Sequence, residues 1–421
     1  MRILLRGVRI IGEKQVDVLL EKGRIARVAS SLSVSADRSY DLDGTVLLPS
    51  LCDIHTHSRQ PGNDEAETLE SFSKAAVHGG ITIACTMPNT NPVVDNPAIV
   101  SYLIREAKRI GLIDIYPVAS ITVGQDGKIL TEMAQLKQAG AVAVSEDGKS
   151  VESARLMRYA FEYAKTVGLL VMVHCEEPTL SEGGVMNEGT TSFRLGLRGI
   201  PEISETIGIL RDLEIATYVG ARVHICHVSL ARSIEIVSRY KRFYPHLITC
   251  ETAPHYLIFT EEDLTNYSTN FKMNPPLRRE QDRKSLLKAI KSGKIDCIAT
   301  DHAPHPDWEK ELEFELSPFG VVGLETWLSA MIHFFVNTGR LTWRDIKRLC
   351  CDRPREILGL RPVGLSEGDV ADLVVVDPMR EWKVEADSLF SRGKNSPFLG
   401  RVLKGKVLLT IKAGKVVFED L

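Results

Sequence analysis

The chain has 421 residues, of which 44% are hydrophobic and 25% are charged, and its formal net charge is −3. This balance lacks the basic excess that a nucleic-acid partner normally requires, and no apolar run is long enough to cross a bilayer. Residues 1–6 carry charges within a short apolar stretch and do not resemble a signal peptide. The length suits one large domain with a smaller companion.

The eight cysteines do not form a C-x-x-C pair, and most lie in or beside apolar runs. Cysteines in such places usually behave as small hydrophobic residues. We therefore expect no disulfide framework and predict a reducing, cytoplasmic setting.

Both ends of the chain predict short antiparallel strands. Apolar and polar residues alternate, with turn residues between the runs, at 3–5, 8–11, 16–20 and 24–28, and again at 372–377, 407–411 and 415–418. This pattern is typical of β-hairpins and meanders. The simplest interpretation is one small sheet domain built from both termini.

The middle of the chain alternates short apolar runs with amphipathic stretches of helical length. The runs are 47–54, 81–86, 113–118, 141–144, 169–173, 222–227, 247–250 and 295–299. Eight such units favour a closed, TIM-type (β/α)8 barrel. An open doubly wound sheet is the alternative, but no G-x-G-x-x-G follows its first strand.

Residues that bind metals or move protons follow these runs. In a β/α barrel the carboxyl ends of all strands gather on one face, and two residues spaced i and i+2 in a strand point to the same side. We therefore expect one shared site. The residues at the strand ends include His55, His57, Asp147, His174, His227 and Asp301.

Each of these residues has a plainer interpretation when it is taken alone. An H-x-H pair such as His55 and His57 arises by chance, His174 is compatible with a hydrogen-bonded core histidine, and Asp147 with a helix N-cap. For all six together, the plainer interpretations require independent coincidences at the same end of five strands. A shared site is the simpler hypothesis.

Four imidazoles and two carboxylates suit a catalytic zinc site. Six ligands exceed what one tetrahedral ion with an open position needs, so a two-metal site bridged by Asp147 is reasonable. Such a site activates water and polarises a carbonyl, which is the chemistry of amide hydrolysis.

Several longer motifs extend the pattern over most of the chain. They are D-I-H-T-H-S-R (53–59), M-P-N-T (87–90), S-E-D-G (145–148), V-H-C-E (173–176), I-C-H-V-S (225–229), M-N-P-P-L-R (273–278), A-T-D-H-A-P-H (299–305) and K-N-S-P-F-x-G (394–400). In this combination the chain resembles the dihydroorotases of the amidohydrolase superfamily, in particular the bacterial type I branch.

The resemblance implies a (β/α)8 barrel over residues 47–362 and a small β-sandwich built from 1–46 and 363–421. It implies one or two zinc ions bound by the six residues above, with Asp147 in the place where many amidohydrolases have a carboxylated lysine. The implied reaction is the reversible opening of dihydroorotate to N-carbamoyl-L-aspartate in pyrimidine synthesis, with Asp301 carrying a proton to the leaving nitrogen.

The resemblance also implies a set of substrate contacts. The planar guanidinium of Arg59 suits the substrate carboxylate. The full set is His57, Arg59, Asn89, Asn274, His305, Phe319 and Gly320.

Two departures from the family pattern concern the first motif. Gln60 stands where the family commonly has an acidic residue, and Thr56 and Ser58 replace more usual apolar residues. We expect Gln60 to tune substrate affinity without abolishing activity.

Two alternative functions remain open. A hydantoinase or allantoinase usually has the carboxylated lysine and does not need an arginine for a substrate carboxylate. A non-catalytic scaffold for aspartate carbamoyltransferase would be expected to have lost metal ligands. A complex with aspartate carbamoyltransferase and a homo-oligomer are both compatible with the sequence, as is a lid formed by residues 178–201 or 306–318.

Overall fold

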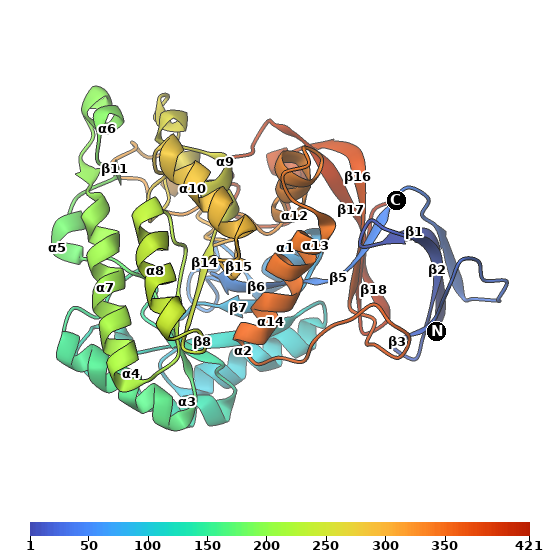
Figure 1. The fold of residues 1–421 in the computed structure, drawn as a ribbon, viewed down its shortest axis with the longest axis horizontal. Coiled ribbons are helices and arrows are strands. Elements are labelled where there is room, and N and C mark those ends of the chain that lie inside the picture. The colour runs from blue at the N-terminus through green and yellow to red at the C-terminus, as the bar shows by residue number, and fades with distance from the viewer.

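The computed structural model describes all residues from 1 to 421 and has two parts (Figure 1). A barrel of parallel strands and outer helices occupies one side, and a sheet that contains both termini occupies the other. Its helices include none with the length and apolar character needed to span a membrane.

The barrel contains the eight predicted strands in consecutive order. A parallel bridge between Thr56 and His302 joins the last strand region to the first and closes the ring. The prediction of a (β/α)8 barrel is therefore confirmed. The strands are β6 (Leu51–Thr56), β7 (Ile81–Thr86), β8 (Asp114–Ser120), β9 (Ala143–Ser145), β10 (Leu170–Val173), β13 (Val223–Ile225), β14 (Ile248–Thr252) and β15 (Cys297–Ile298).

The outer helices form where amphipathic stretches carry clear end signals. In one of them, the Asn96 side chain accepts hydrogen bonds from the first free N–H groups, and Gly111 ends the helix in the left-handed conformation. The longer helices are α1 (Leu69–His78), α2 (Pro97–Ile110), α3 (Met133–Ala139), α4 (Ala154–Val167), α7 (Glu202–Val219), α8 (Ala231–Phe243) and α10 (Glu280–Lys291).

Shorter elements decorate the barrel. The predicted lid segment at 178–201 contains two short helices and a two-stranded ribbon, and the segment at 306–318 contains one short helix. They are α5 (Pro178–Ser181), β11 (Met186–Asn187), α6 (Thr190–Leu195), β12 (Gly199–Ile200), α9 (Pro254–Ile258), α11 (Asp307–Lys310), α12 (Trp327–Met331), α13 (Trp343–Lys347) and α14 (Arg353–Ile357).

The second part is an eight-stranded sheet drawn from both ends of the chain, as predicted. Most of its pairs are antiparallel, but β1 pairs in parallel with both β4 and β5. β4, which pairs with β1 outside the main strand order, meets the edge strand β18 where Arg38 binds Glu419, and the sheet packs around an apolar core of its own. Its strands are β1 (Arg2–Ile10), β2 (Gln15–Glu21), β3 (Arg24–Ala29), β4 (Arg38–Asp41), β5 (Val46–Pro49), β16 (Leu373–Lys383), β17 (Val402–Lys412) and β18 (Lys415–Glu419).

The first apolar run, expected as one strand, is two strands in different sheets. β5 pairs with β1 and β16, and β6 begins the barrel after Ser50. Pro49 has no N–H to donate and ends β5. The domain boundaries at 46/47 and 362/363 stay a prediction.

After β16 the chain returns to the barrel before it finishes the sheet. The buried carboxylate of Glu325 accepts the backbone N–H groups of Phe390 and Ser391 at 3.0 Å, and that of Glu67 accepts the N–H of Arg392 at 3.1 Å. These bonds fix the segment that carries Asn395 against the carboxyl ends of the barrel strands.

Candidate active site

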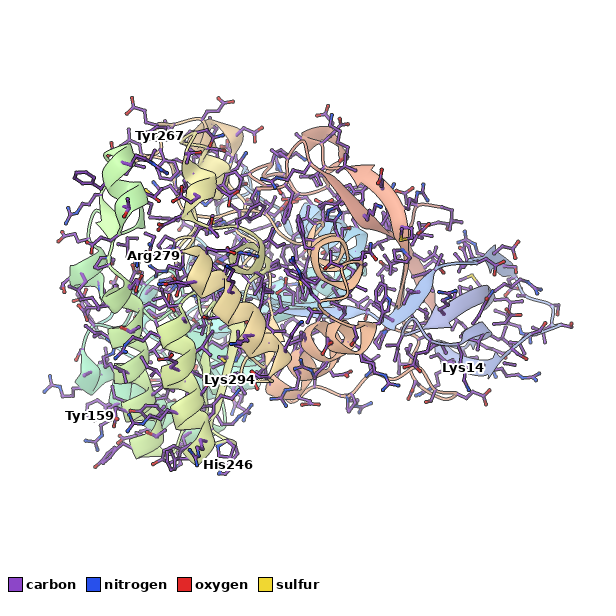
Figure 2. All side chains as sticks on the ribbon, turned by 45° about the horizontal axis from the view of Figure 1, so that its top comes forward. Lys14, Tyr159, His246, Tyr267, Arg279 and Lys294 are labelled. Carbon is purple, nitrogen blue, oxygen red and sulfur yellow. The ribbon has the colours of Figure 1, made fainter.

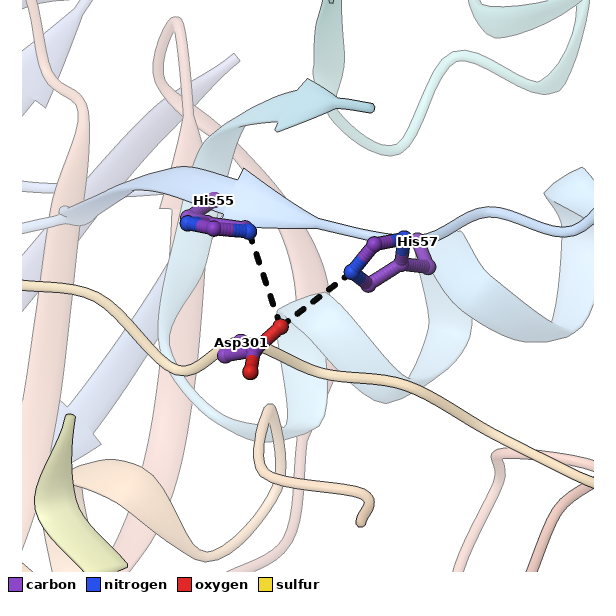
Figure 3. Close-up of side chains that lie close together, drawn as sticks. All are labelled: His55, His57 and Asp301. Carbon is purple, nitrogen blue, oxygen red and sulfur yellow. Dashed lines mark hydrogen bonds and ion pairs between the residues drawn. The ribbon is translucent and has the colours of Figure 1, made fainter. Parts of the chain in front are cut away.

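His55, His57 and Asp301 meet at the carboxyl end of the first and last barrel strands (Figure 3). Oδ1 of Asp301 lies 3.1 Å from Nε2 of His57 and 3.5 Å from Nε2 of His55. Burial opposes ionisation of Asp301, but its hydrogen bond to His57 and the two nearby imidazoles lower its pKa to about 2. The carboxylate is therefore ionised at neutral pH.

Asp147 lies at the centre of the cluster. Its Oδ1 is 3.1 Å from Nε2 of His55, 4.0 Å from Nδ1 of His174 and 3.9 Å from Nε2 of His227. Its Oδ2 is 3.5 Å from Nε2 of His57. One carboxylate thus faces ligand atoms on both sides, which is the geometry that a bridging ligand needs.

The donor set fits a bound metal. Nε2 of His55 and Oδ1 of Asp147 are buried, and neither makes a hydrogen bond. Buried polar atoms without partners are costly and rare unless an ion or water satisfies them. Two groups of three residues, His55–His57–Asp301 and His55–Asp147–His227, hold their ligand atoms close enough for one ion each. Imidazole and carboxylate donors of this kind suit zinc.

Three of the histidines are oriented by a partner on the far side of the ring. Nδ1 of His55 is 2.7 Å from Oε1 of Glu251, and Nδ1 of His57 is 2.8 Å from Oδ1 of Asn89. Nε2 of His174 is 3.0 Å from Glu176, so its Nδ1 faces the cluster. Such outer partners fix the tautomer and direction of metal-binding imidazoles.

Three residues of the cluster and its rim have strained backbones. Arg59, His227 and Asp301 have φ values of 57°, 34° and 50°, in the region that side-chain-bearing residues rarely adopt. Strain of this kind costs about 1–3 kcal/mol per residue and tends to gather at functional sites. It turns these side chains inward at the strand ends.

A pocket of about 230 Å³ opens over the cluster. It brings together all of the predicted substrate contacts, and a larger hollow of about 820 Å³ shares Gly148 with it. Lining residues are His57, Arg59, Asn89, Asp147, Gly148, His174, His227, Asn274, Asp301, Ala303, His305, Phe319 and Gly320.

One wall of the pocket combines Arg59 with His305. Nη2 of Arg59 is 3.2 Å from Nε2 of His305, and its Nε donates to the carbonyl oxygen of Pro304 at 3.0 Å. Burial and the neighbouring charge of Arg59 lower the pKa of His305 to about 2, so this imidazole is neutral. The wall therefore carries one positive charge, suited to an anionic group on a ligand.

At the other edge of this wall, the backbone of Gly320 lies close to Ala303 and His305. Its φ is +136°, and a Cβ there would lie 2.8 Å from Ala303 and 3.0 Å from Nε2 of His305. Only glycine fits. The Gly320 carbonyl oxygen accepts from Nδ2 of Asn395 at 3.0 Å and from Nζ of Lys310 at 3.1 Å.

Three residues that contact the cluster or the pocket wall are not assigned a role by the sequence: Glu176, Glu251 and Asn395. Glu251 and Glu176 were visible as polar residues at strand ends, and Asn395 lay in a motif without an assigned function. The signal for Glu251 was its place at the end of β14 on the barrel face. No feature of the sequence indicates that Asn395 contacts the pocket-lining residues Ala303, His305 and Gly320.

Comparison with known proteins identifies the family of the chain. A family model described as dihydro-orotase-like matches residues 44–233. The chain is 44% identical to a dihydroorotase of Trichlorobacter lovleyi and 43% identical to one of Syntrophus aciditrophicus, and each alignment covers 100% of both chains.

Solved structures agree with the fold. The L-hydantoinase (dihydropyrimidinase) of Arthrobacter aurescens has 25% identity and a TM-score of 0.87, over 99% of this chain and 96% of its own. Full-length identity is much higher to the dihydroorotases than to this hydantoinase, so the alternative of a hydantoinase is not favoured. The chain belongs to the dihydroorotase family and is a cyclic amide hydrolase.

Proposed function

We propose that the chain catalyses the reversible hydrolysis of dihydroorotate to N-carbamoyl-L-aspartate and so serves pyrimidine synthesis. The observation that carries this proposal is the shared pocket, in which the Asp147 cluster forms one side and the cationic Arg59–His305 wall another. Hydrolysis of a cyclic amide that carries a carboxylate on its ring requires both a metal-binding cluster and a cationic group that binds the carboxylate.

We further propose that His55, His57, Asp147, His174, His227 and Asp301 would hold one or two zinc ions. Zinc, when bound, supplies Lewis acidity that activates water and polarises the amide carbonyl. The unsatisfied atoms of His55 and Asp147 support this assignment.

The chain's own side chains transfer the proton and bind the substrate. The ionised Asp301 carboxylate lines the pocket. It takes up the proton released when water attacks the amide carbonyl, and then gives this proton to the ring nitrogen as the amide bond breaks. Arg59 binds the substrate carboxylate, together with Asn89 and His305. Asn274 and the backbone at Phe319 and Gly320 hold the ring amides.

Two further assignments belong to this proposal. The eight cysteines are free and buried, which supports a reducing, cytoplasmic setting. A complex with aspartate carbamoyltransferase stays a prediction.

The decisive experiment pairs metal analysis with an assay on the purified protein. We expect one or two zinc ions per chain, turnover of dihydroorotate, and little turnover of hydantoin or allantoin, which lack the ring carboxylate. Full metal content without turnover of dihydroorotate would favour a non-catalytic scaffold.

A further inference from the structure

Two lysine side chains are buried beside the pocket, Lys272 with an exposed fraction of 2% and Lys310 with one of 7%. Lysine is almost never buried to this extent unless its charge is paired. Here each ammonium group donates to backbone carbonyl oxygens, and neither donates to a carboxylate. An ion pair therefore does not explain why these two lysines are buried.

Lys310, the last residue of α11, holds the backbone on both sides of Phe319. Its Nζ donates to the carbonyl oxygen of Pro318 at 2.9 Å and to that of Gly320 at 3.1 Å. In a trans peptide the C=O and N–H groups point in opposite directions. The Phe319 N–H therefore points away from Lys310, and it donates to no group of the chain. Since Phe319 and Gly320 both line the pocket, this arrangement leaves a free backbone donor beside it.

Lys272 holds the same segment at further points. Its Nζ donates to the carbonyl oxygens of Phe314 and Glu315 at 2.6 and 3.1 Å. Its own carbonyl oxygen accepts the Gly320 N–H at 2.9 Å. The ammonium nitrogen also lies 4.8 Å from the centre of the Phe319 ring, as in a cation–π contact. Lys272 therefore limits where both Phe319 and Gly320 can lie.

The two lysines join two segments that are far apart in the sequence. Lys272 belongs to the stretch between Tyr267 and Arg279, which are both labelled in Figure 2. This stretch runs inward from the exposed Tyr267 to the pocket-lining Asn274. Residues 310–320 follow the last barrel strand. The lysines thus connect the two segments that carry the proposed contacts to the ring amides.

We propose that Lys272 and Lys310 are positioning residues, which set the backbone at Phe319 and Gly320 for the ring amides of the substrate. This inference rests on the proposed function, because it concerns the same pocket. Neither lysine lines the pocket. Their effect on the substrate therefore passes through the backbone groups that they hold.

The cost of burying two ammonium groups supports this role. Burial lowers the pKa of Lys272 to about 8, and burial together with the charge of Lys272 lowers that of Lys310 to about 7. Apolar side chains would fill the same space without this cost. An ammonium group has three donors and no acceptor, so one group can bind two carbonyl oxygens at once. The hydrogen bonds to the backbone are therefore what the two lysines contribute.

Steady-state kinetics of Lys310→Met and Lys272→Met test the proposal, because methionine keeps most of the side-chain length and removes the donors. We expect KM for dihydroorotate to rise by about tenfold or more and kcat to change by less than about threefold, since the amide contacts exist both before and during the reaction. Zinc content should stay at the wild-type level. The matched control is Lys137→Met, which removes a lysine that donates to the backbone carbonyl oxygens of Val167 and Gly168, away from the pocket lining. An unchanged KM in both variants, a loss that falls on kcat alone, or loss of zinc together with activity overturns the proposal.

Hydrogen–deuterium exchange tests the positioning without any turnover. Peptides that cover residues 314–321 should exchange at least about tenfold faster in Lys310→Met and Lys272→Met than in the wild type, while the barrel strands keep their wild-type rates. Lys137→Met should leave these peptides unchanged. Wild-type exchange of 314–321 in both variants, or faster exchange throughout the barrel, also overturns the proposal. A wild type that does not turn over dihydroorotate would refute the proposed function, and this exchange experiment would still decide whether the lysines hold the pocket wall.

Discussion

Oε1 of Glu251 lies 2.7 Å from Nδ1 of His55, on the side of the ring that faces away from Asp147. Burial opposes its charge, but His55 and His224 lower the pKa of Glu251 to about 2, and the carboxylate is ionised. An ionised partner at this atom fixes the Nδ1–H tautomer and leaves Nε2 of His55 free for the cluster.

Replacing this carboxylate should weaken metal binding. We expect Glu251→Gln to lower zinc affinity or kcat/KM roughly 10- to 100-fold, measured by competition with a chelator and by steady-state kinetics. Asp282→Asn, which alters a buried carboxylate that is bonded to Ala231 and does not line the pocket, is the control. Unchanged zinc affinity and kcat/KM in Glu251→Gln would remove Glu251 from the site.

Arg59 should contribute mainly to substrate binding. Arg59→Met removes the positive charge of the wall while keeping much of the side-chain volume. We expect kcat/KM to fall by an amount equivalent to about 2–5 kcal/mol of binding free energy. The loss should fall chiefly on KM, and Arg59→Lys should recover only part of it because one ammonium cannot replace a planar fork. A variant that loses kcat at unchanged KM would contradict this role.

Asn395 should position the substrate-facing backbone. Its Nδ2 donates to the carbonyl oxygens of Ala303 and Gly320 at 3.1 and 3.0 Å, and its Oδ1 accepts from the N–H of His305 at 3.1 Å. Asn395→Ala removes the partner of the Ala303 carbonyl and of the His305 N–H and leaves the Gly320 carbonyl with Lys310 alone. We expect at least a tenfold loss in kcat/KM through misplacement of the wall. Zinc content should stay at the wild-type level. Loss of zinc together with activity would instead indicate a general collapse of the site.

Lys310 should make stability depend on pH. Burial and the nearby charge of Lys272 lower the pKa of Lys310 to about 7 against the opposing charge of Glu309, whereas an unfolded lysine has a pKa of about 10.4. Between these values the unfolded chain holds a proton that the folded chain has released, so this group makes the free energy of unfolding rise with pH.

Urea unfolding at pH 7, 8 and 9 measures this effect. The free energy of unfolding of the wild type should rise by up to about 1.4 kcal/mol per pH unit relative to that of Lys310→Met. The control is Lys288→Met, at an exposed position of α10, which should follow the wild-type curve. Parallel curves for wild type and Lys310→Met would refute the prediction.

Gln60 has a structural role that a carboxylate could also fill. Its Oε1 accepts the N–H of Leu69, the first residue of α1, at 2.7 Å. Gln60→Glu keeps this acceptor and adds a negative charge near a helix N-terminus, worth about 0.3–1 kcal/mol of stability. We expect a small rise in melting temperature and a change in kcat/KM of less than about tenfold. An increase in kcat/KM by orders of magnitude would show that Gln60 impairs the wild-type site.

The sequence predicted the barrel well because most residues of its strands are buried, on both faces of the sheet, so that each strand is an apolar run. β7, for example, has the predicted bounds 81–86. The sheet from both termini was also predicted, but the parallel pairing of β1 with β4 and β5 was not. Alternation of apolar and polar residues indicates a strand and says nothing about which neighbour it pairs with.

The candidate site was predicted where residues lie directly at strand ends. His55, Asp147 and Asp301 come together because a barrel fixes the positions of its strand ends. The position of Asn395 could not be predicted from the sequence. It lies beside Gly320 because the chain returns to the barrel after β16 and is held there by Glu67 and Glu325. No local pattern describes such long-range contacts.

The contact between Asn395 and Gly320 also has a consequence for biosynthesis. A ribosome completes all six proposed metal-binding residues by Asp301, well before it reaches the residue that braces the pocket wall. At that point β5 also lacks its neighbour β16. A chain cut short between residues 302 and 394 therefore carries every proposed ligand and an unbraced pocket, so the proposed substrate site is completed only as synthesis ends.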